Sequence, residues 1–307
     1  MCLMEGLVAR TTGSWYRVFV SSGQCYDCRL RGNYRLRGNK QTNPVAVGDR
    51  VEFSLLEDGT GVISAVHDRV NYIVRRATKL SKQTHVIAAN IDMLSVVATL
   101  AFPRTSTGFI DRLLVTAEAY HVPACIIFNK TDLLENDLYG VQESLASIYR
   151  SAGYPVYMVS ALTGDGIDIL KNDMSGKTVL FCGHSGVGKS ALLNSINPGL
   201  NLKTGNISEW SLKGKHTTTF AELLSLGEGY LIDTPGIKEF GMVDFTPQEL
   251  GHFFPEMRAV LHDCHFANCT HRHEPQCAVK RAVEDGRISE ERYSNYLSII
   301  DSIETDG

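Results

Sequence analysis

The first part of the chain alternates apolar with polar positions in short runs that Gly, Asn and Pro interrupt. A period of two is typical of strands with one buried face, and a series of short strands favours a small all-β barrel. The alternation predicts strands at 6–9, 15–20, 25–30, 50–55 and 61–66. We therefore expect residues 1–75 to form a small barrel.

The pattern changes at about residue 76 to nearly continuous apolar runs of strand length, separated by stretches with helical periodicity. Strands are expected at 93–99, 124–128, 156–159, 178–182 and 230–232, and helices at 110–119 and 142–149. Apolar strands that alternate with helices indicate a mainly parallel sheet covered on both faces. Residues 76–241 are thus predicted to form an α/β domain.

A third pattern begins at about residue 242 and is mostly helical. Helices are expected at 247–261, 274–285 and 290–303, around a loop rich in cysteine and histidine. We assign residues 242–307 to a helical domain.

Composition agrees with a globular chain. Of the 307 residues, 43% are hydrophobic and 21% charged, and the net charge of −4 is small, which argues against disorder. The longest apolar stretch, 93–102, is about half of what a membrane span needs. The first ten residues lack the basic and apolar regions of a secretory signal. We expect a cytoplasmic protein, monomeric and without membrane contact.

The small net charge conceals a division, because residues 1–75 sum to +3 and the remainder to −7. The string RLRGN occurs at 29–33 and again at 35–39. In a hairpin, alternation would bring four arginines and two nearby tyrosines together: Arg29, Arg31, Arg35, Arg37, Tyr26 and Tyr34. Such a face is typical of oligonucleotide-binding (OB) barrels. A merely solvated arginine face explains the pattern equally well.

Cysteine and histidine cluster between residues 252 and 277. The string C-x4-C-x-H-x5-C supplies three thiolates and an imidazole from Cys264, Cys269, His271 and Cys277. This donor set is common in structural zinc sites. His265 or His273 could replace the central imidazole, and a chance cluster is the alternative to a metal site. Cys25 and Cys28 have no second ligand pair nearby, so we interpret them as strand residues.

A phosphate-binding loop is expected directly after strand 178–182. The sequence fits G-x-x-x-x-G-K-[ST] and opens a helix: Gly183, His184, Ser185, Gly186, Val187, Gly188, Lys189, Ser190, then Ala191. The backbone N–H groups of such a loop surround a phosphate at a helix N-terminus. Lys189 would contact the β- and γ-phosphates and Ser190 would bind Mg²⁺. The alternative is a glycine-rich turn without a ligand.

Two further motifs indicate the base. The first is N-K-x-D, directly after strand 124–128: Asn129, Lys130, Thr131 and Asp132. The carboxylate of Asp132 would accept both N1–H and the exocyclic amine of guanine, which adenine does not offer together, so ATP should be rejected. Asn129 would link this region to the phosphate loop, and the stem of Lys130 would lie along the ring. Ser160 and Ala161 resemble the motif whose backbone N–H reaches the guanine O6.

The remaining motifs would sense the γ-phosphate. Asp233 begins a D-x-x-G sequence, in which it would hold Mg²⁺ through water while the N–H of Gly236 contacts the phosphate. The sequence of residues 216–219 resembles a switch segment whose threonine, taken as Thr218, completes the magnesium shell. Any of the three threonines could serve.

The motifs occur in an unusual order, because N-K-x-D and Ser160 precede the phosphate loop. An ordinary GTPase sheet can form only if the chain is circularly permuted. The D-x-x-G segment then leads directly into the helical domain. The fold class predicted is a circularly permuted P-loop GTPase domain, preceded by an OB-like barrel and followed by a helical zinc-binding domain.

Taken together, NKTD, GHSGVGKS, GKHTTT, DTPG and CHFANCTHRHEPQC resemble the circularly permuted ribosome small subunit-dependent GTPase A family. The resemblance spans nearly the whole chain. It implies a GTPase of late small-subunit (30S) maturation that contacts 16S rRNA and is stimulated by the subunit. It also implies that the zinc ligands are Cys264, Cys269, His271 and Cys277.

Hydrolysis needs a group that orients the attacking water, and the residue after DTPG is the aliphatic Ile237. We therefore expect slow intrinsic turnover. Our hypothesis is that His216, beside the threonines, supplies the missing polar group. A histidine that only caps the loop is the alternative. A P-loop kinase or ATPase, and a protein that holds GTP only as a structural ligand, remain open as other functions.

Overall fold

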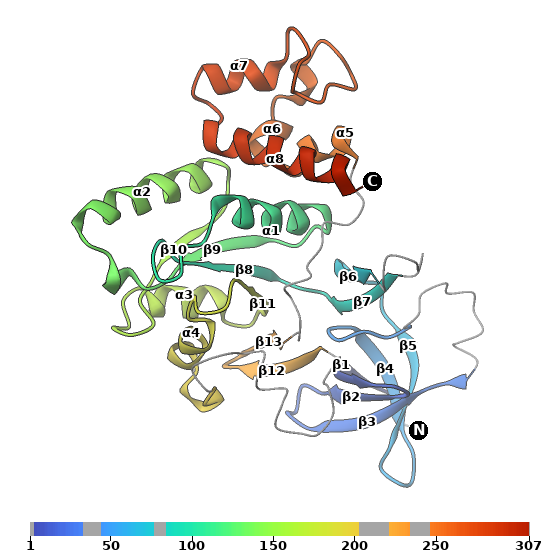
Figure 1. Cartoon of the computed structure of the whole chain (residues 1–307). Helices are drawn as coiled ribbons and strands as arrows, with labels where there is room; N and C mark the ends of the chain where they lie inside the picture. The colour runs from blue at the N-terminus through green and yellow to red at the C-terminus, as the bar shows by residue number, and fades with distance from the viewer. Residues whose placement is uncertain (1–2, 33–43, 77–83, 203–220, 234–245, 307) are drawn as a thin grey trace.

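The computed structural model describes residues 3–32, 44–76, 84–202, 221–233 and 246–306. They form three parts, which follow one another along the chain (Figure 1). Within these ranges, none of the helices has the length and apolar character needed to cross a membrane.

The first part is a closed five-stranded barrel, as predicted. Its strands are β1 (Leu3–Thr12), β2 (Trp15–Phe19), β3 (Cys25–Leu30), β4 (Arg50–Leu55) and β5 (Gly61–Val66). They pair in the order β1-β2-β3-β5-β4, and β4 closes on β1. Val18, Phe53 and Ile63 fill the core. Gly61 lets β5 approach β3, because a Cβ there would lie 2.3 Å from the Cys28 Sγ.

The second part is the expected α/β sheet. Its strands are β8 (Met93–Ala98), β9 (Ala124–Phe128), β10 (Val156–Met158), β11 (Thr178–Cys182), β12 (Glu222–Leu226) and β13 (Gly229–Asp233). Their order is β10-β9-β8-β11-β13-β12, and β12 pairs antiparallel with β13 while the other neighbours are parallel. Every residue of β8 is buried, as a central strand covered on both faces requires.

Helices cover both faces of this sheet. The helices are α1 (Thr107–Ala119), α2 (Asn136–Ser151), α3 (Ile167–Met174) and α4 (Lys189–Ile196). Most buried apolar residues of α1 belong to one core cluster with those of α2, and those of α3 and α4 belong to another. Val115 of α1 instead packs in the core of the C-terminal helical part. The sequence pattern predicted α1 and the second half of α2 but missed α3.

The barrel and the α/β sheet are joined edge to edge. β1 pairs with β12 at Arg10 and Glu222, whose side chains are 3.9 Å apart. A separate hairpin, β6 (Tyr72–Arg76) and β7 (Thr84–Ala89), was not predicted. The expected boundary between residues 75 and 76 lies within β6. β7 forms a β-bridge to Val47, which is distant in the sequence. A local pattern of apolar and polar positions does not indicate such a contact.

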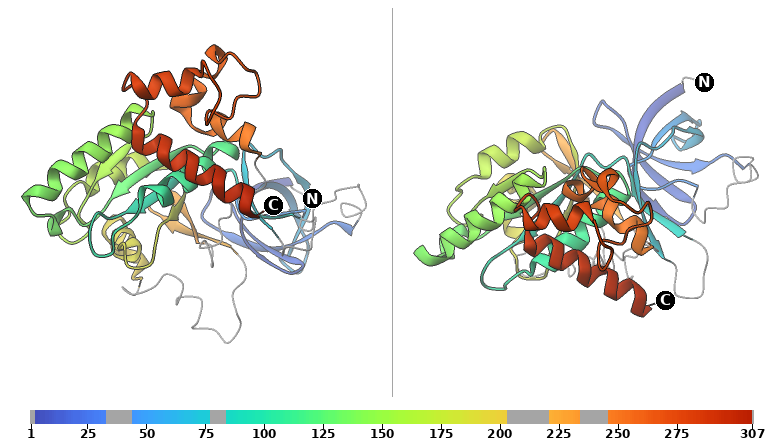
Figure 2. Two further views of the ribbon diagram at one scale, coloured as in Figure 1. Left: turned by 45° about the horizontal axis from the view of Figure 1, so that its top comes forward. Right: turned by 90° about the horizontal axis from the view of Figure 1, so that it is seen from above.

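The third part is helical, but two of its helices differ from the prediction. Its helices are α5 (Pro247–Leu250), α6 (Pro255–Arg258), α7 (Ala278–Glu284) and α8 (Glu290–Asp306). The single helix expected at 247–261 is wrong, because Pro255 cannot continue a helix and instead opens α6 at its first position. The helix expected at 274–285 begins only at Ala278, since the preceding residues form a loop. Helix α8 lies across the α/β domain beside α1 (Figure 2).

Candidate nucleotide and metal sites

The predicted nucleotide motifs that fall within the described residues lie at one edge of the sheet. β8, β9, β10 and β11 are parallel, so the loops that follow them leave from their carboxyl ends. This edge is where open α/β sheets bind ligands. Asp233 ends β13, which runs parallel beside β11, and its backbone therefore reaches the same edge.

The loop after β11 has the backbone shape of a phosphate cradle. Gly183, Gly186 and Gly188 all have positive φ, at 153°, 85° and 92°. A Cβ at Gly183 would lie 2.3 Å from the Val97 carbonyl oxygen, and one at Gly188 would lie 2.5 Å from Nδ2 of Asn129. Only glycine satisfies both the torsion and the space. α4 starts directly after Gly188, which leaves the N-terminal N–H groups of that helix at the loop.

Lys189 folds back over this loop. Its Nζ donates to the carbonyl oxygens of Gly183 and His184, each at 2.7 Å. The next side chain, Ser190, is buried in the first turn of α4. The cation is therefore held against the loop, where a bound phosphate would receive a charge-assisted bond.

Asn129 connects three loops. Its Nδ2 donates to the Val187 carbonyl oxygen at 2.9 Å, and its Oδ1 accepts from the Ala161 N–H at 3.1 Å. The residue is 3% exposed, so the bond to Val187 is shielded from water and the bond to Ala161 is partly shielded. The N-K-x-D loop, the Ser160 loop and the phosphate loop are thus fixed relative to one another by one amide.

Lys130 adds a second link between these loops. It adopts a left-handed backbone with φ of 65°. Its Nζ donates to the carbonyl oxygens of Gly186 and Phe102. The ammonium group therefore ties the phosphate loop both to the N-K-x-D loop and to the connection between β8 and α1.

Asp132 is positioned by Ser160, a contact that the sequence motifs do not indicate. The Ser160 hydroxyl donates to Oδ1 of Asp132, and it accepts the N–H groups of Leu162 and Thr163 at 3.3 and 3.1 Å. The Thr131 N–H donates to the Val159 carbonyl oxygen. The expected role of the Ser160 segment was a backbone contact to the base, and only the folded arrangement brings its hydroxyl to the carboxylate.

A second unforeseen contact lies on the other side of the phosphate loop. The His184 ring stacks on Phe109, with centroids 3.8 Å apart and an interplanar angle of 26°. Phe109 is in the first turn of α1, where its N–H donates to the N-cap hydroxyl of Ser106. A histidine in the variable part of a P-loop and an aromatic residue 75 positions earlier give no local signal of this contact.

Part of the predicted site lies outside the described residues. This holds for His216, Thr217, Thr218, Thr219, Gly236 and Ile237. Their roles remain predictions.

The cysteine and histidine cluster has the geometry of a metal site. The ligand atoms of its four members lie within 4.8 Å of one another: Cys264, Cys269, His271 and Cys277. His271 Nδ1 is 3.6 Å from the Cys264 Sγ and 3.3 Å from the Cys277 Sγ. In a tetrahedral zinc site, ordinary bond lengths place N and S about 3.5 Å apart. The donor set and its spacing thus fit one tetrahedral ion.

The other histidines considered for the fourth ligand lie elsewhere. His265 is exposed and packs edge-on against Phe266, while His273 is exposed. Burial raises the pKa of Cys269 to about 12 and lowers the pKa of His271. These apolar surroundings disfavour free charge, so an ion would have to supply the charge that stabilises the thiolates.

A network of hydrogen bonds holds the metal loop, residues 264–277. Glu274 accepts from the N–H and the hydroxyl of Thr270 and from the N–H of Arg272. Burial alone would raise the pKa of Glu274, but these bonds lower it to about 2. From α8, Tyr293 donates to the His271 carbonyl oxygen at 2.6 Å and Tyr296 to that of Thr270 at 2.8 Å. The ligands therefore sit on a braced loop.

Comparison with known proteins agrees with this arrangement. Residues 66–243 match the RsgA GTPase family, and residues 5–63 match the RsgA N-terminal domain family. A Bacteroides fragilis protein named "Small ribosomal subunit biogenesis GTPase RsgA" is 51% identical over 98% of this chain and 97% of its own. A Bacteroides thetaiotaomicron protein of the same type, numbered RsgA 2, is 52% identical over the same shares.

Two solved structures are similar along their whole length. YjeQ from Thermotoga maritima has a TM-score of 0.82 at 38% identity, covering 98% of this chain and 99% of that one. YloQ, described as a circularly permuted GTPase, has a TM-score of 0.80 at 31% identity, covering 100% and 96%. The predicted permutation is thereby confirmed, and the chain belongs to the RsgA GTPase family.

Proposed function

We propose that this protein hydrolyses GTP in the late maturation of the small ribosomal subunit, in the cytoplasm, and that the subunit stimulates hydrolysis. The observation that carries the proposal is the fixed assembly of three loops around Asn129, which links the phosphate cradle to the two base-recognition segments. The names of the 51–52% identical relatives supply the biological context.

Guanine selection follows from the Asp132 contacts. The Ser160 hydroxyl holds one carboxylate oxygen, which restricts the rotation of the group. A fixed, partly desolvated carboxylate can accept the two adjacent N–H donors of guanine at little further entropic cost. Adenine would leave the same carboxylate without those donors.

The phosphates would bind at the cradle. Lys189 would exchange its bonds to the Gly183 and His184 carbonyls for stronger bonds to phosphate oxygens. Ser190, Thr218 and Asp233 would hold Mg²⁺, which neutralises charge on the phosphates when it is bound. We assign orientation of the attacking water to His216 and contact with the γ-phosphate to the N–H of Gly236.

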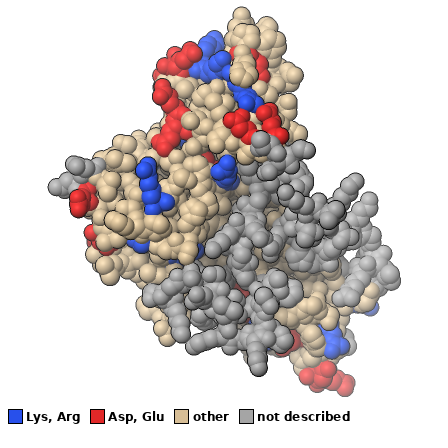
Figure 3. Space-filling view, viewed as in Figure 1, with Lys and Arg blue, Asp and Glu red and all other residues tan. Residues whose placement is uncertain are grey.

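The barrel is our candidate for the 16S rRNA contact. Residues 1–75 carry the positive surplus of the chain, and Arg29 lies 4.0 Å above the Trp15 ring, with both side chains on neighbouring strands. On the face shown in Figure 3, the C-terminal part carries acidic and basic groups side by side. We further propose that residues 234–245, between β13 and α5, transmit the nucleotide state to the helical part.

The test is GTP turnover by the purified protein, with and without added 30S particles, over a salt series. We expect strong stimulation that falls steeply with salt, because contacts to RNA phosphates release counterions. Asp132→Asn should weaken GTP binding by at least about 10²-fold. Asp165→Asn, which alters an exposed carboxyl group in the neighbouring loop, should leave binding unchanged. Equal competition by ATP, or turnover indifferent to 30S particles, would refute the proposal.

We also propose that the metal loop holds one structural zinc ion. Zinc content after gel filtration should be one ion per chain for the unaltered protein and should fall in Cys269→Ser. Cys25→Ser is the matched control, since Cys25 is exposed on the barrel and is not part of the cluster. Equal zinc in both variants would exclude the assignment.

A further inference from the structure

One turn of α8 contacts both the metal loop and the α/β domain. On one side, Tyr293 and Tyr296 hold the carbonyl groups of the metal loop, as described above. On the other side, Arg292 donates from Nη1 to Oδ1 of Asp111 on α1 at 2.6 Å, and Asn295 donates from Nδ2 to Oδ2 at 2.7 Å. Two positions on this turn thus bond to the α/β domain and two to the metal loop of the helical part itself.

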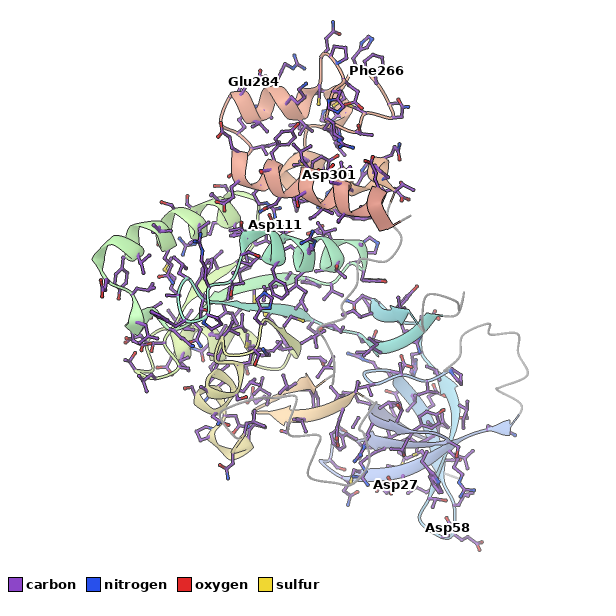
Figure 4. The ribbon with its side chains drawn as sticks, viewed as in Figure 1. Asp27, Asp58, Asp111, Phe266, Glu284 and Asp301 are labelled. Atoms are coloured by element: carbon purple, nitrogen blue, oxygen red, sulfur yellow. The ribbon has the colours of Figure 1, made fainter. Side chains whose placement is uncertain are left out.

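The contact with α1 is close and dry. Asp111 is 0% exposed and Arg292 is 2% exposed. A Cβ on Gly108, in the first turn of α1, would lie 3.4 Å from Oδ1 of Asn295. Figure 4 shows Asp111 at the junction of the two domains, beneath α8. Because the charged groups are buried and mutually bonded, α1 and α8 cannot shift independently without breaking strong hydrogen bonds.

The first turn of α1 also touches the phosphate loop. Phe109, two residues before Asp111, stacks on His184. The His184 carbonyl oxygen accepts one of the two hydrogen bonds from Lys189. A phosphate that draws Lys189 toward itself would therefore change the bonding of the residue whose ring lies on α1.

We propose that α1 couples nucleotide binding thermodynamically to metal binding, through the path from His184 and Phe109 to Asp111, Arg292 and the metal loop. This inference rests on the proposed function, which places a guanine nucleotide at the cradle and zinc at the cluster. The path is distinct from the segment 234–245 that joins the two parts covalently. Coupling of this kind is reciprocal, so each ligand strengthens the binding of the other by the same factor.

The experiment measures zinc release from the full-length, zinc-loaded protein to a chromogenic chelator, with and without saturating GDP. GDP should slow release at least about fivefold in the unaltered protein, the lower end of usual allosteric coupling. In Phe109→Leu, and independently in Asn295→Ala, the effect of GDP should fall below about twofold while GDP still saturates the protein. Removal of zinc should weaken GDP binding by the same factor by which saturating GDP raises the equilibrium affinity for zinc in a chelator competition.

The matched control is Phe19→Leu, which removes another stacked ring, on Tyr230, away from the path. It should retain the full effect of GDP, because the ratio of release rates does not respond to a general loss of stability. Zinc release that GDP does not change, in a protein that binds both, would overturn the coupling and leave the proposed function intact. Unchanged ratios in both Phe109→Leu and Asn295→Ala would overturn the path. Failure to bind GDP or zinc would refute the proposed function, and this inference with it.

Discussion

Removal of the Arg292 charge should loosen the junction between the α/β domain and the helical part. Arg292 bonds to Asp111 at 2.6 Å and to Glu256 on α6 at 2.7 and 3.1 Å. Its guanidinium lies 4.6 Å from the ring centroid of Phe254. Arg292→Met keeps an unbranched apolar stem but removes the guanidinium, and so leaves the fully buried carboxylate of Asp111 without its cation. Breaking such a pair costs about 3–5 kcal/mol.

Hydrogen exchange with mass spectrometry measures this loss locally. Since about 1.4 kcal/mol corresponds to a factor of ten, the amides of α1 and α8 should exchange about two to three orders of magnitude faster, up to the limit set by global unfolding. The barrel strands serve as the internal control and should not change. Combining Arg292→Met with Asp111→Asn and Glu256→Gln removes all three charges and should restore most of the protection.

The stability lost in Arg292→Met should also depend on pH. Burial raises the pKa of Asp111 above its ordinary 3.8, against the lowering effect of Arg292. Without Arg292 this pKa rises further. A carboxyl whose pKa is higher in the folded state favours folding at low pH and loses that contribution as the pH rises through the folded pKa. Arg292→Met should therefore cost less in mildly acidic than in mildly alkaline buffer. Unchanged exchange in α8, or a cost independent of pH, would refute the reasoning.

Three smaller changes test other parts of the molecule. Gln142 is 1% exposed and neither of its amide atoms has a partner in the described part of the chain, so Gln142→Met should raise stability by about 1 kcal/mol, read from thermal unfolding. Glu274→Gln should weaken zinc binding about 10- to 100-fold in a chelator competition, because the loop loses charge-assisted bonds, whereas Glu284→Gln at the exposed end of α7 should not. Ser160→Ala should weaken GTP binding about tenfold by equilibrium titration, since Asp132 loses the hydroxyl that holds it, and unchanged affinity would contradict that role.

Local patterns predicted much of the fold because their information lies within a few residues. Alternation located the five barrel strands, and apolar runs located β8, β9 and β11 within one residue of their ends. Motif order alone indicated the permutation. The spacing of the cysteines and histidines indicated a metal loop, although it left the fourth ligand open.

Local periodicity missed two features for different reasons, since one depends on distant segments and the other on a single proline. The hairpin of β6 and β7 has short strands and depends on a bridge to Val47. The stretch 247–261 has helical composition, but Pro255 and the packing of α6 against the domain interface divide it. Hydrophobic periodicity alone does not indicate where a proline interrupts the backbone hydrogen bonds of a helix.

The chemical groups of this protein and their order along the chain can be read from neighbouring residues, because strand, loop and ligand motifs are local. How these groups are held depends on contacts between distant elements. Asp111 and Arg292 are 181 positions apart, Asn129 and Val187 are 58 apart, and His184 meets Phe109 across two elements. Such contacts form because burial of apolar surface brings distant elements together, and a polar group buried between them is stabilised by a hydrogen bond to one of them. Those partners set the orientation of Asp132, the bracing of the metal loop and the junction through α1.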